Sequence, residues 1–152
     1  MSRVSITDEL SHVRLNRQKQ CKGHTKVDSI AVLMASRRPD DLKNALSDLR
    51  AQTLPTFELH LGLHGFNLDA SLKSEITKLQ NRKVKVFVHN FASTETLGSM
   101  LTSLAAGTRT KYVTKMDDDD FYGSEHLHDL LDCIIVRGCD VVGKAMNYIY
   151  LE

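Results

Sequence analysis

The pattern of hydrophobic and polar residues divides the chain at about residue 28. Residues 1–28 are polar and basic, and the weak spacing of Leu10, Val13 and Leu15 permits only a short helix or a linker. From residue 29 to residue 152, short apolar runs alternate with segments whose apolar residues recur every three or four positions. We therefore expect an N-terminal extension over 1–28 and one folded domain over 29–152.

The short apolar runs predict β-strands. IAVLMA, at Ile30–Ala35, is uninterrupted, which is typical of a strand covered on both faces. Further strands are predicted at FELHLGL (57–63), VKVFV (84–88), KYVTKM (111–116), DVVG (140–143) and AMNYIYL (145–151).

The segments between these runs predict amphipathic helices. In SRRPDDLKNALSDLRAQ, Pro39 suits a first helical turn, and Leu42, Leu46 and Leu49 fall on one face. Similar patterns predict helices in ASLKSEITKLQ, in TETLGSMLTSLAAG, which ends at Gly107, and in SEHLHDLLDCIIVRG, with Ser124 as N-cap and Gly138 as stop. This alternation predicts an α/β fold, a three-layer α/β/α sandwich with a mostly parallel sheet and helices on both faces.

The composition excludes several classes of protein. With 152 residues the chain fits one domain, and its net charge of +1 argues against a nucleic-acid partner. No apolar run approaches the roughly 18 residues that a membrane span needs, and the N-terminus lacks the apolar stretch of a secretory signal. The three cysteines form no CxxC pair, so we expect reduced thiols and a cytoplasmic protein.

Three polar clusters follow predicted strands. They are Ser36–Arg38 after the first strand, His64–Asn67 after the second and Asp117–Asp120 after the fourth. Ligands of α/β sheets bind beyond the carboxyl ends of the strands. The sequence therefore predicts a ligand site that these clusters share.

The four consecutive aspartates favour a cation site, with a solvated polar turn as the alternative. In extended backbone, alternate residues project to one side about 6.5–7 Å apart, so we expect Asp117 and Asp119 to face one crevice and Asp118 and Asp120 to face elsewhere. Carboxylate oxygens favour Mg²⁺ or Mn²⁺, either of which bridges to a diphosphate. An EF-hand calcium loop is disfavoured, because a strand precedes the run and Tyr122 would occupy a ligand position without a carboxylate.

Three separated stretches resemble the nucleotide-binding half of family 2-type glycosyltransferases with the GT-A fold. They are DSIAVLMASRRPDDLKNALSDLRAQTLPTFELHLGLHGF, which starts at Asp28, then YVTKMDDDDFYGSEHLHDLL, and then DVVGKAMNYIYLE. Within them, AQTLPTFEL and MDDDDFYGSEHL match the family pattern closely. The resemblance covers about Asp28 to Glu152. It implies a Rossmann-like GT-A fold and transfer of a sugar from a nucleotide diphosphate-sugar, for which a UDP-sugar is expected. Mn²⁺ or Mg²⁺ is implied at the D-x-D motif.

The same resemblance implies roles for individual residues. The nucleotide-sugar-binding residues that it implies are Ala35, Ser36, Arg37, His64, Asp117 and Asp118. Asp119 is the implied metal ligand, and Asp117 either reaches the metal through water or binds the ribose. Arg37 stacks on a base or meets a phosphate, with a solvated loop arginine as the alternative.

The sequence also departs from the family pattern. Many members carry an aspartate after the second strand, where this chain has His64, which reads a base edge or lies on plain surface. The family's arginine in the helix after the third strand has no counterpart here.

The sequence stops before the acceptor half of the family, so the general base is expected beyond residue 152. The chain is predicted to be a fragment of a longer enzyme or a truncated homologue. The alternative function is a non-catalytic nucleotide-binding or interaction domain. An open sheet edge left by the missing half predicts pairing with a second copy.

Overall fold

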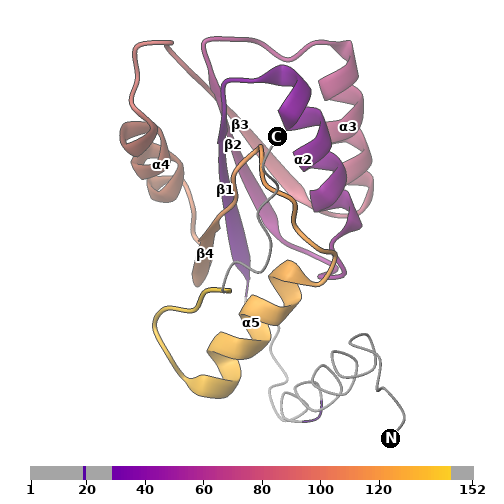
Figure 1. Ribbon diagram of the computed structural model, residues 1–152, viewed down its shortest axis with the longest axis vertical. Helices are drawn as coiled ribbons and strands as arrows, with labels where there is room; N and C mark the ends of the chain where they lie inside the picture. The colour runs from indigo at the N-terminus through magenta and orange to yellow at the C-terminus, as the bar shows by residue number, and fades with distance from the viewer. Residues whose placement is uncertain (1–18, 20–28, 145–152) are drawn as a thin grey trace, which may run out of the picture. The chain divides into compact units, whose positions relative to one another are not determined.

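The computed structural model describes Lys19 and residues 29–144. Its elements are β1 (Ile30–Ser36), α2 (Pro39–Ala51), β2 (Glu58–His64), α3 (Ala70–Asn81), β3 (Lys85–Phe91), α4 (Leu97–Ala106), β4 (Tyr112–Lys115) and α5 (His126–Arg137) (Figure 1). The chain divides into two compact units. One spans Asp28–His126, and the other combines Met1–Val27 with Leu127–Glu152. The predicted extension over 1–28, apart from Lys19, and the predicted strand over 145–151 lie outside the described residues.

The unit that spans Asp28–His126 contains a sheet of four parallel strands in the order β3-β2-β1-β4. After β3 the chain crosses back over the sheet to β4, so the direction of strand addition reverses. Because crossovers between parallel strands are right-handed, this reversal places α4 on the face opposite α2 and α3 (Figure 1). The predicted α/β sandwich with a parallel sheet is confirmed.

The apolar positions that predicted the elements form the core of this unit. In β1, the central strand, Ala31, Val32 and Met34 are fully buried. The apolar stripe of α2 is equally buried, and so are the alternate leucines of β2: Leu42, Leu46, Leu49, Leu59, Leu61 and Leu63. Burial of one such leucine contributes about 1.5–3 kcal/mol, so these positions hold the sheet and helices together.

Glycine permits close packing and a tight turn where β2 meets its neighbours. A Cβ atom added to Gly62 would lie 3.1 Å from the side chains of Met100 and Phe91, so the absence of a side chain lets α4 approach β2. Gly65 has a φ of +76°, and a Cβ there would lie 2.9 Å from the Cβ atom of Ser93. Gly65 is therefore required both by its backbone and by its neighbour.

Several predicted boundaries and one predicted strand differ from the structure. β3 continues to Phe91, beyond the predicted end at Val88, because its backbone pairs with β2 as far as His64. This pairing extends the strand through the polar residues His89 and Asn90. α5 begins at His126, since the carbonyl of Ser124 accepts a hydrogen bond from the Thr53 amide (2.7 Å) and lies outside the helix. The predicted strand DVVG over 140–143 is wrong, because it pairs with no described strand and Val141 is 85% exposed.

Candidate functional site

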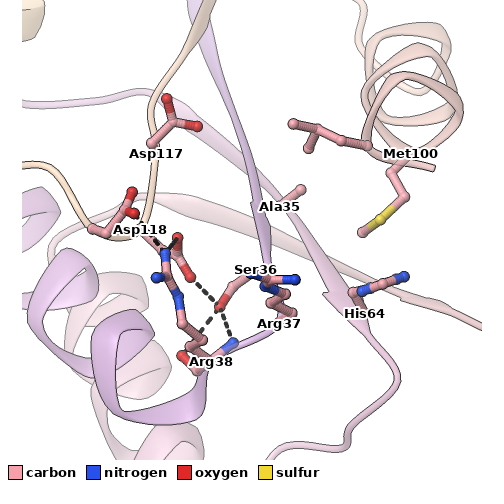
Figure 2. Close-up of a pocket in the computed structure, with 10 residues that line it drawn as sticks. Ala35, Ser36, Arg37, Arg38, His64, Met100, Asp117 and Asp118 are labelled. Atoms are coloured by element: carbon pink, nitrogen blue, oxygen red, sulfur yellow. Dashed lines mark hydrogen bonds and ion pairs between the residues drawn. The ribbon is translucent and has the colours of Figure 1, made fainter. Parts of the chain in front are cut away.

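A cleft of about 380 Å³ opens beyond the carboxyl ends of β1 and β4. Its lining residues are Ala35, Ser36, Arg37, Arg38, His64, Leu97, Met100, Asp117, Asp118 and Asp119 (Figure 2). These two strands stand side by side at the point where the strand order reverses. The loop after β4 is hydrogen-bonded to the loop after β1, and the cleft lies between these two loops and the first turn of α4.

All seven residues predicted to bind nucleotide-sugar or metal line this one cleft, although they come from separate segments. The roles of these seven residues stay predictions. Sequence reasoning included Arg38 in the polar cluster after the first strand but gave it no role, and it missed Leu97 and Met100. The spacing of Leu97 and Met100 on one helical face was a visible signal. The position of Arg38 between a strand and a helix was a weaker one.

Asp118 is a buried structural partner of the turn after β1. Its carboxylate is 8% exposed, and Oδ2 accepts a hydrogen bond of 2.6 Å from the Ser36 hydroxyl. Oδ1 accepts a second hydrogen bond, of 3.1 Å, from Nη2 of Arg38. Both oxygens are thus occupied, and Asp118 ties the loop after β4 to the loop after β1 (Figure 2).

Asp119 is more accessible than Asp118. Its side chain is 53% exposed, and Oδ2 lies 2.7 Å from Nη2 of Arg38. The hydrogen bond from Arg38 holds the pKa of Asp119 below its usual range, so the carboxylate is ionised at neutral pH. Oδ1 of Asp119 has no ion pair with a described residue, and the side chain lines the cleft.

Asp117 is held from two sides. Its carboxylate forms an ion pair with Lys115, and its backbone amide donates a 2.8 Å hydrogen bond to the phenol oxygen of Tyr122. The Tyr122 hydroxyl in turn donates to Asp120 (3.3 Å). Burial raises the pKa of Tyr122 to about 12, so the phenol stays neutral and closes the loop over 117–122.

The predicted division of the aspartates between two sides is wrong for Asp118. Asp117, Asp118 and Asp119 all line the cleft. β4 ends at Lys115, and residues 118–120 form a bend in which the alternation of an extended strand does not apply. Asp120, in contrast, lines a neighbouring acidic groove beside α2 and does not line the cleft.

His64 and Met100 line the side of the cleft away from the aspartates (Figure 2). Nε2 of His64 lies 3.0 Å from the backbone carbonyl oxygen of Glu95. A carbonyl oxygen only accepts, so Nε2 carries the proton, and in the neutral ring Nδ1 is an acceptor. The cleft therefore has carboxylates on one side and an apolar wall with one nitrogen acceptor on the other.

The carboxylates of the cleft fit a hard divalent cation. Within the described residues, no three His, Cys, Asp or Glu side chains converge on a metal position. Two accessible carboxylates, Asp117 and Asp119, remain after Asp118 is excluded by its own hydrogen bonds. Mg²⁺ commonly takes only one or two carboxylates, with water and substrate phosphates as the other ligands, so this donor set is sufficient.

Comparison with known proteins identifies the fold. No family model and no curated protein matches the sequence. The solved structures similar to this chain include S. aureus TarS 1–349, with a TM-score of 0.61 and 18% identity over 79% of this chain and 38% of that one. A second S. aureus TarS structure gives a TM-score of 0.60 and 19% identity over 78% and 23% of the two chains. TarS 1–349 in complex with UDP-GlcNAc gives 0.62 and 18% over 79% and 37%.

This likeness confirms the predicted GT-A fold. The chain spans less than two fifths of the length of each of these TarS chains. In the described residues, no helix has the length and apolar character needed to cross a membrane.

Proposed function

We propose that the cleft binds a nucleotide diphosphate-sugar together with Mn²⁺ or Mg²⁺, as the donor site of a glycosyltransferase. The observation that carries the proposal is the pairing, in one cleft, of two accessible carboxylates with an apolar wall and a nitrogen acceptor. The carboxylates suit a metal-bound diphosphate, and the apolar wall with its nitrogen acceptor suits a nucleoside. The shared fold of TarS, which has been crystallised with UDP-GlcNAc, supports the same assignment.

Asp119 and Asp117 would hold the cation in this proposal. A bound Mn²⁺ or Mg²⁺ supplies positive charge to the diphosphate as the bond to the sugar breaks. Asp118 orients the site, because its hydrogen bonds to Ser36 and Arg38 fix the loop that carries the other two carboxylates. In this proposal the run of aspartates thus combines one buried structural residue, Asp118, with two metal ligands, Asp117 and Asp119.

We propose a UDP-sugar as the donor on the basis of the His64 tautomer. With Nε2 donating to the Glu95 carbonyl, Nδ1 is an acceptor that matches the N3–H donor of uracil. Cytosine has an unprotonated nitrogen at that position, and two acceptors would face each other. Met100 and the half-exposed Leu97 offer apolar surface to the face of a base.

The described cleft accounts for donor binding and not for activation of the acceptor. Asp117 and Asp119 are assigned to the cation, and both oxygens of Asp118 are occupied. No carboxylate of the cleft is left to take a proton from an acceptor hydroxyl. We assign that role to a group outside the described residues.

A non-catalytic nucleotide-binding or interaction domain is the second candidate function. The exposed edge strand favours it, because among the described strands β3 pairs on one side only, and Phe87 and Val88 are 43% and 37% exposed. A second copy that pairs along β3 is the partner we propose under this reading.

Calorimetric titration tests the donor-site proposal. We expect UDP to bind at least about tenfold more tightly with Mn²⁺ than with a chelator, because the cation joins the diphosphate to Asp119. Uridine, which lacks the diphosphate, serves as the matched ligand and should show no dependence on Mn²⁺. Absence of UDP binding, or equal metal dependence for uridine, would contradict the proposal.

A further inference from the structure

We propose that Arg38 is the resident counter-cation of Asp119 and that it moves from this carboxylate to the donor diphosphate when a divalent cation binds. Arg38 would thereby couple metal binding to nucleotide binding. This inference rests on the proposed donor site. It assigns to Arg38 a positioning role that the sequence did not indicate.

Arg38 is bonded to three carboxylates from two segments of the chain. Nη2 contacts Asp118 at 3.1 Å and Asp119 at 2.7 Å, and Nε contacts Asp41 at 2.8 Å. Arg38 is the N-cap residue of α2, with extended backbone and no side-chain cap hydrogen bond. The guanidinium is therefore held against the loop that carries Asp118 and Asp119 (Figure 2).

The three ion pairs differ in how readily Arg38 can leave them. Asp118 is buried and also bonded to Ser36, and Asp41 lies one helical turn away on the same segment as Arg38. Asp119 is 53% exposed. An exposed ion pair contributes little in water, whereas loss of a buried one leaves an unpaired charge. Asp119 is thus the partner that Arg38 releases at the lowest cost.

Arg38 opposes binding of a cation on its own. A guanidinium 2.7 Å from Asp119 occupies one oxygen of the carboxylate that a divalent ion needs, and the two positive charges repel each other. Metal ions alone should therefore bind weakly. The charge of the aspartates is meanwhile balanced by Arg38 and by the Lys115–Asp117 ion pair.

Arg38 favours binding of the cation together with a nucleotide. The side chain lines the same cleft, and once released its planar fork can donate two parallel hydrogen bonds to phosphate oxygens. These hydrogen bonds to the diphosphate then replace the ion pair with Asp119. Since linkage is reciprocal, each ligand raises the affinity of the other through Arg38.

The test is the Arg38→Gln variant, with Arg37→Gln as a matched control. Both changes remove one positive charge from the lining of the cleft, but the described residues give Arg37 no ion pair with an aspartate. Free Mn²⁺ is followed by electron paramagnetic resonance, and UDP binding at saturating Mn²⁺ by calorimetry. Circular dichroism melting checks that each variant is folded.

We expect Arg38→Gln to bind Mn²⁺ alone about tenfold more tightly and to bind UDP with Mn²⁺ about tenfold more weakly. Arg37→Gln should change Mn²⁺ binding less than about threefold. A purely structural role for Arg38 would weaken both ligands together, so unchanged or weaker Mn²⁺ binding by Arg38→Gln would overturn the exchange.

A second variant, Arg38→Lys, keeps the charge without the fork. It should leave binding of Mn²⁺ alone within about threefold of wild type and still weaken UDP, because an ammonium makes no paired contact with phosphate. Wild-type strength for UDP in Arg38→Lys would contradict the transfer to the diphosphate. If the wild type binds UDP but Arg38→Gln does not bind Mn²⁺ more tightly and UDP more weakly, only the exchange fails. If wild type binds no UDP, the proposed function fails as well.

Discussion

The cleft and the neighbouring part of β2 and β3 both bury polar side chains, but in different ways. In the cleft, buried Ser36 and Asp118 are bonded to each other at 2.6 Å. On β2 and β3, the stacked rings of His60, Phe87, His89 and Phe91 form an imidazole–aromatic ladder, in which the centroids of His60 and His89 lie 5.8 Å apart. In the described chain, Nδ1 of His60 and Nε2 of His89 are buried without a hydrogen-bond partner.

The difference extends to charge. In the cleft, the hydrogen bond from Arg38 lowers the pKa of Asp119, so the site keeps its carboxylate ionised. In the ladder, burial and the neighbouring His60 lower the pKa of His89, so the ring stays neutral. One region keeps an ionised carboxylate, and the other uses imidazoles as flat packing surfaces. This comparison teaches that the chain buries polar side chains in two ways, with complete hydrogen bonds as for Asp118, or as stacked rings that keep an unpaired nitrogen.

The largest expected effect on stability comes from the loss of the buried Asp118 carboxylate. Asp118→Ala removes the shortest hydrogen bond of the Ser36 hydroxyl and leaves it only the backbone of Arg38 as a partner. It also breaks the bond between Asp118 and the Arg38 guanidinium, and it should lower the free energy of unfolding by about 2–3 kcal/mol. Asp119→Ala removes an exposed ion pair and should cost less than about 1 kcal/mol. Urea denaturation measures both. Equal losses of stability in the two variants would contradict the distinction between a structural role for Asp118 and a ligand role for Asp119.

A second prediction compares two histidines of the same strand. His64→Leu should reduce the preference for UDP over CDP from about tenfold to less than about threefold, because the Nδ1 acceptor is lost. His60→Leu, on the ladder, should leave that preference unchanged. Competition titration at saturating Mn²⁺ measures the ratio, and a preference that survives His64→Leu would refute the proposed reading of the base.

Loss of the Tyr122 hydroxyl should lower stability less than loss of the Asp118 carboxylate. Tyr122→Phe removes the acceptor of the Asp117 amide and should cost about 1 kcal/mol at neutral pH. The folded pKa of about 12 exceeds the ordinary value of 10.0, so the stabilisation is present below pH 10 and is lost as pH rises toward 12. Ultraviolet titration should show a tyrosine that ionises near pH 12 in wild type and is missing in Tyr122→Phe.

The smallest expected change concerns the ladder. His60→Leu removes a buried ring whose Nδ1 is unpaired and whose Nε2 makes only a long contact of 3.5 Å with Glu58, so it should change the free energy of unfolding by no more than about 1 kcal/mol. Thermal and urea unfolding give the change. A loss as large as that of Asp118→Ala would show that the ladder depends on polar contacts after all.

Acid should affect the ladder in a defined direction. Because the pKa of His89 is lower in the folded chain than its ordinary 6.5, the unfolded chain takes up the proton first, and stability falls as pH drops below about 6.5. His89→Phe should flatten this part of the stability profile, whereas Asp119→Ala should not. An unchanged acid slope in His89→Phe would contradict the assignment.

Local patterns predicted most of the fold. The continuous apolar run of β1 and the leucine stripe of α2 indicated elements within a residue or two of those observed, because both are buried as their patterns imply. The failed strand over 140–143 shows the limit of such patterns. Two valines favour a strand, but a strand also needs a partner, and no local signal supplies one.

The contents of the cleft were predictable, and its internal bonds were not. The rule that ligands bind beyond parallel strands brought Ser36, His64 and the aspartates to one place. The burial of Asp118 depends on Arg38, 80 residues away in the chain, and on the bend that follows Lys115. Such long-range pairing leaves no periodic trace in the sequence, so the roles of neighbouring aspartates could not be separated there.

The central claim is that Asp119 holds a cation for a nucleotide diphosphate. Its most direct test is calorimetric titration of UDP with and without Mn²⁺, using Asp119→Asn and the neighbouring Asp120→Asn, which makes the same charge change outside the cleft. We predict that Mn²⁺ strengthens UDP binding about tenfold or more in wild type and in Asp120→Asn, and that this gain disappears in Asp119→Asn. An equal gain in all three proteins, or its loss in Asp120→Asn alone, would contradict the account.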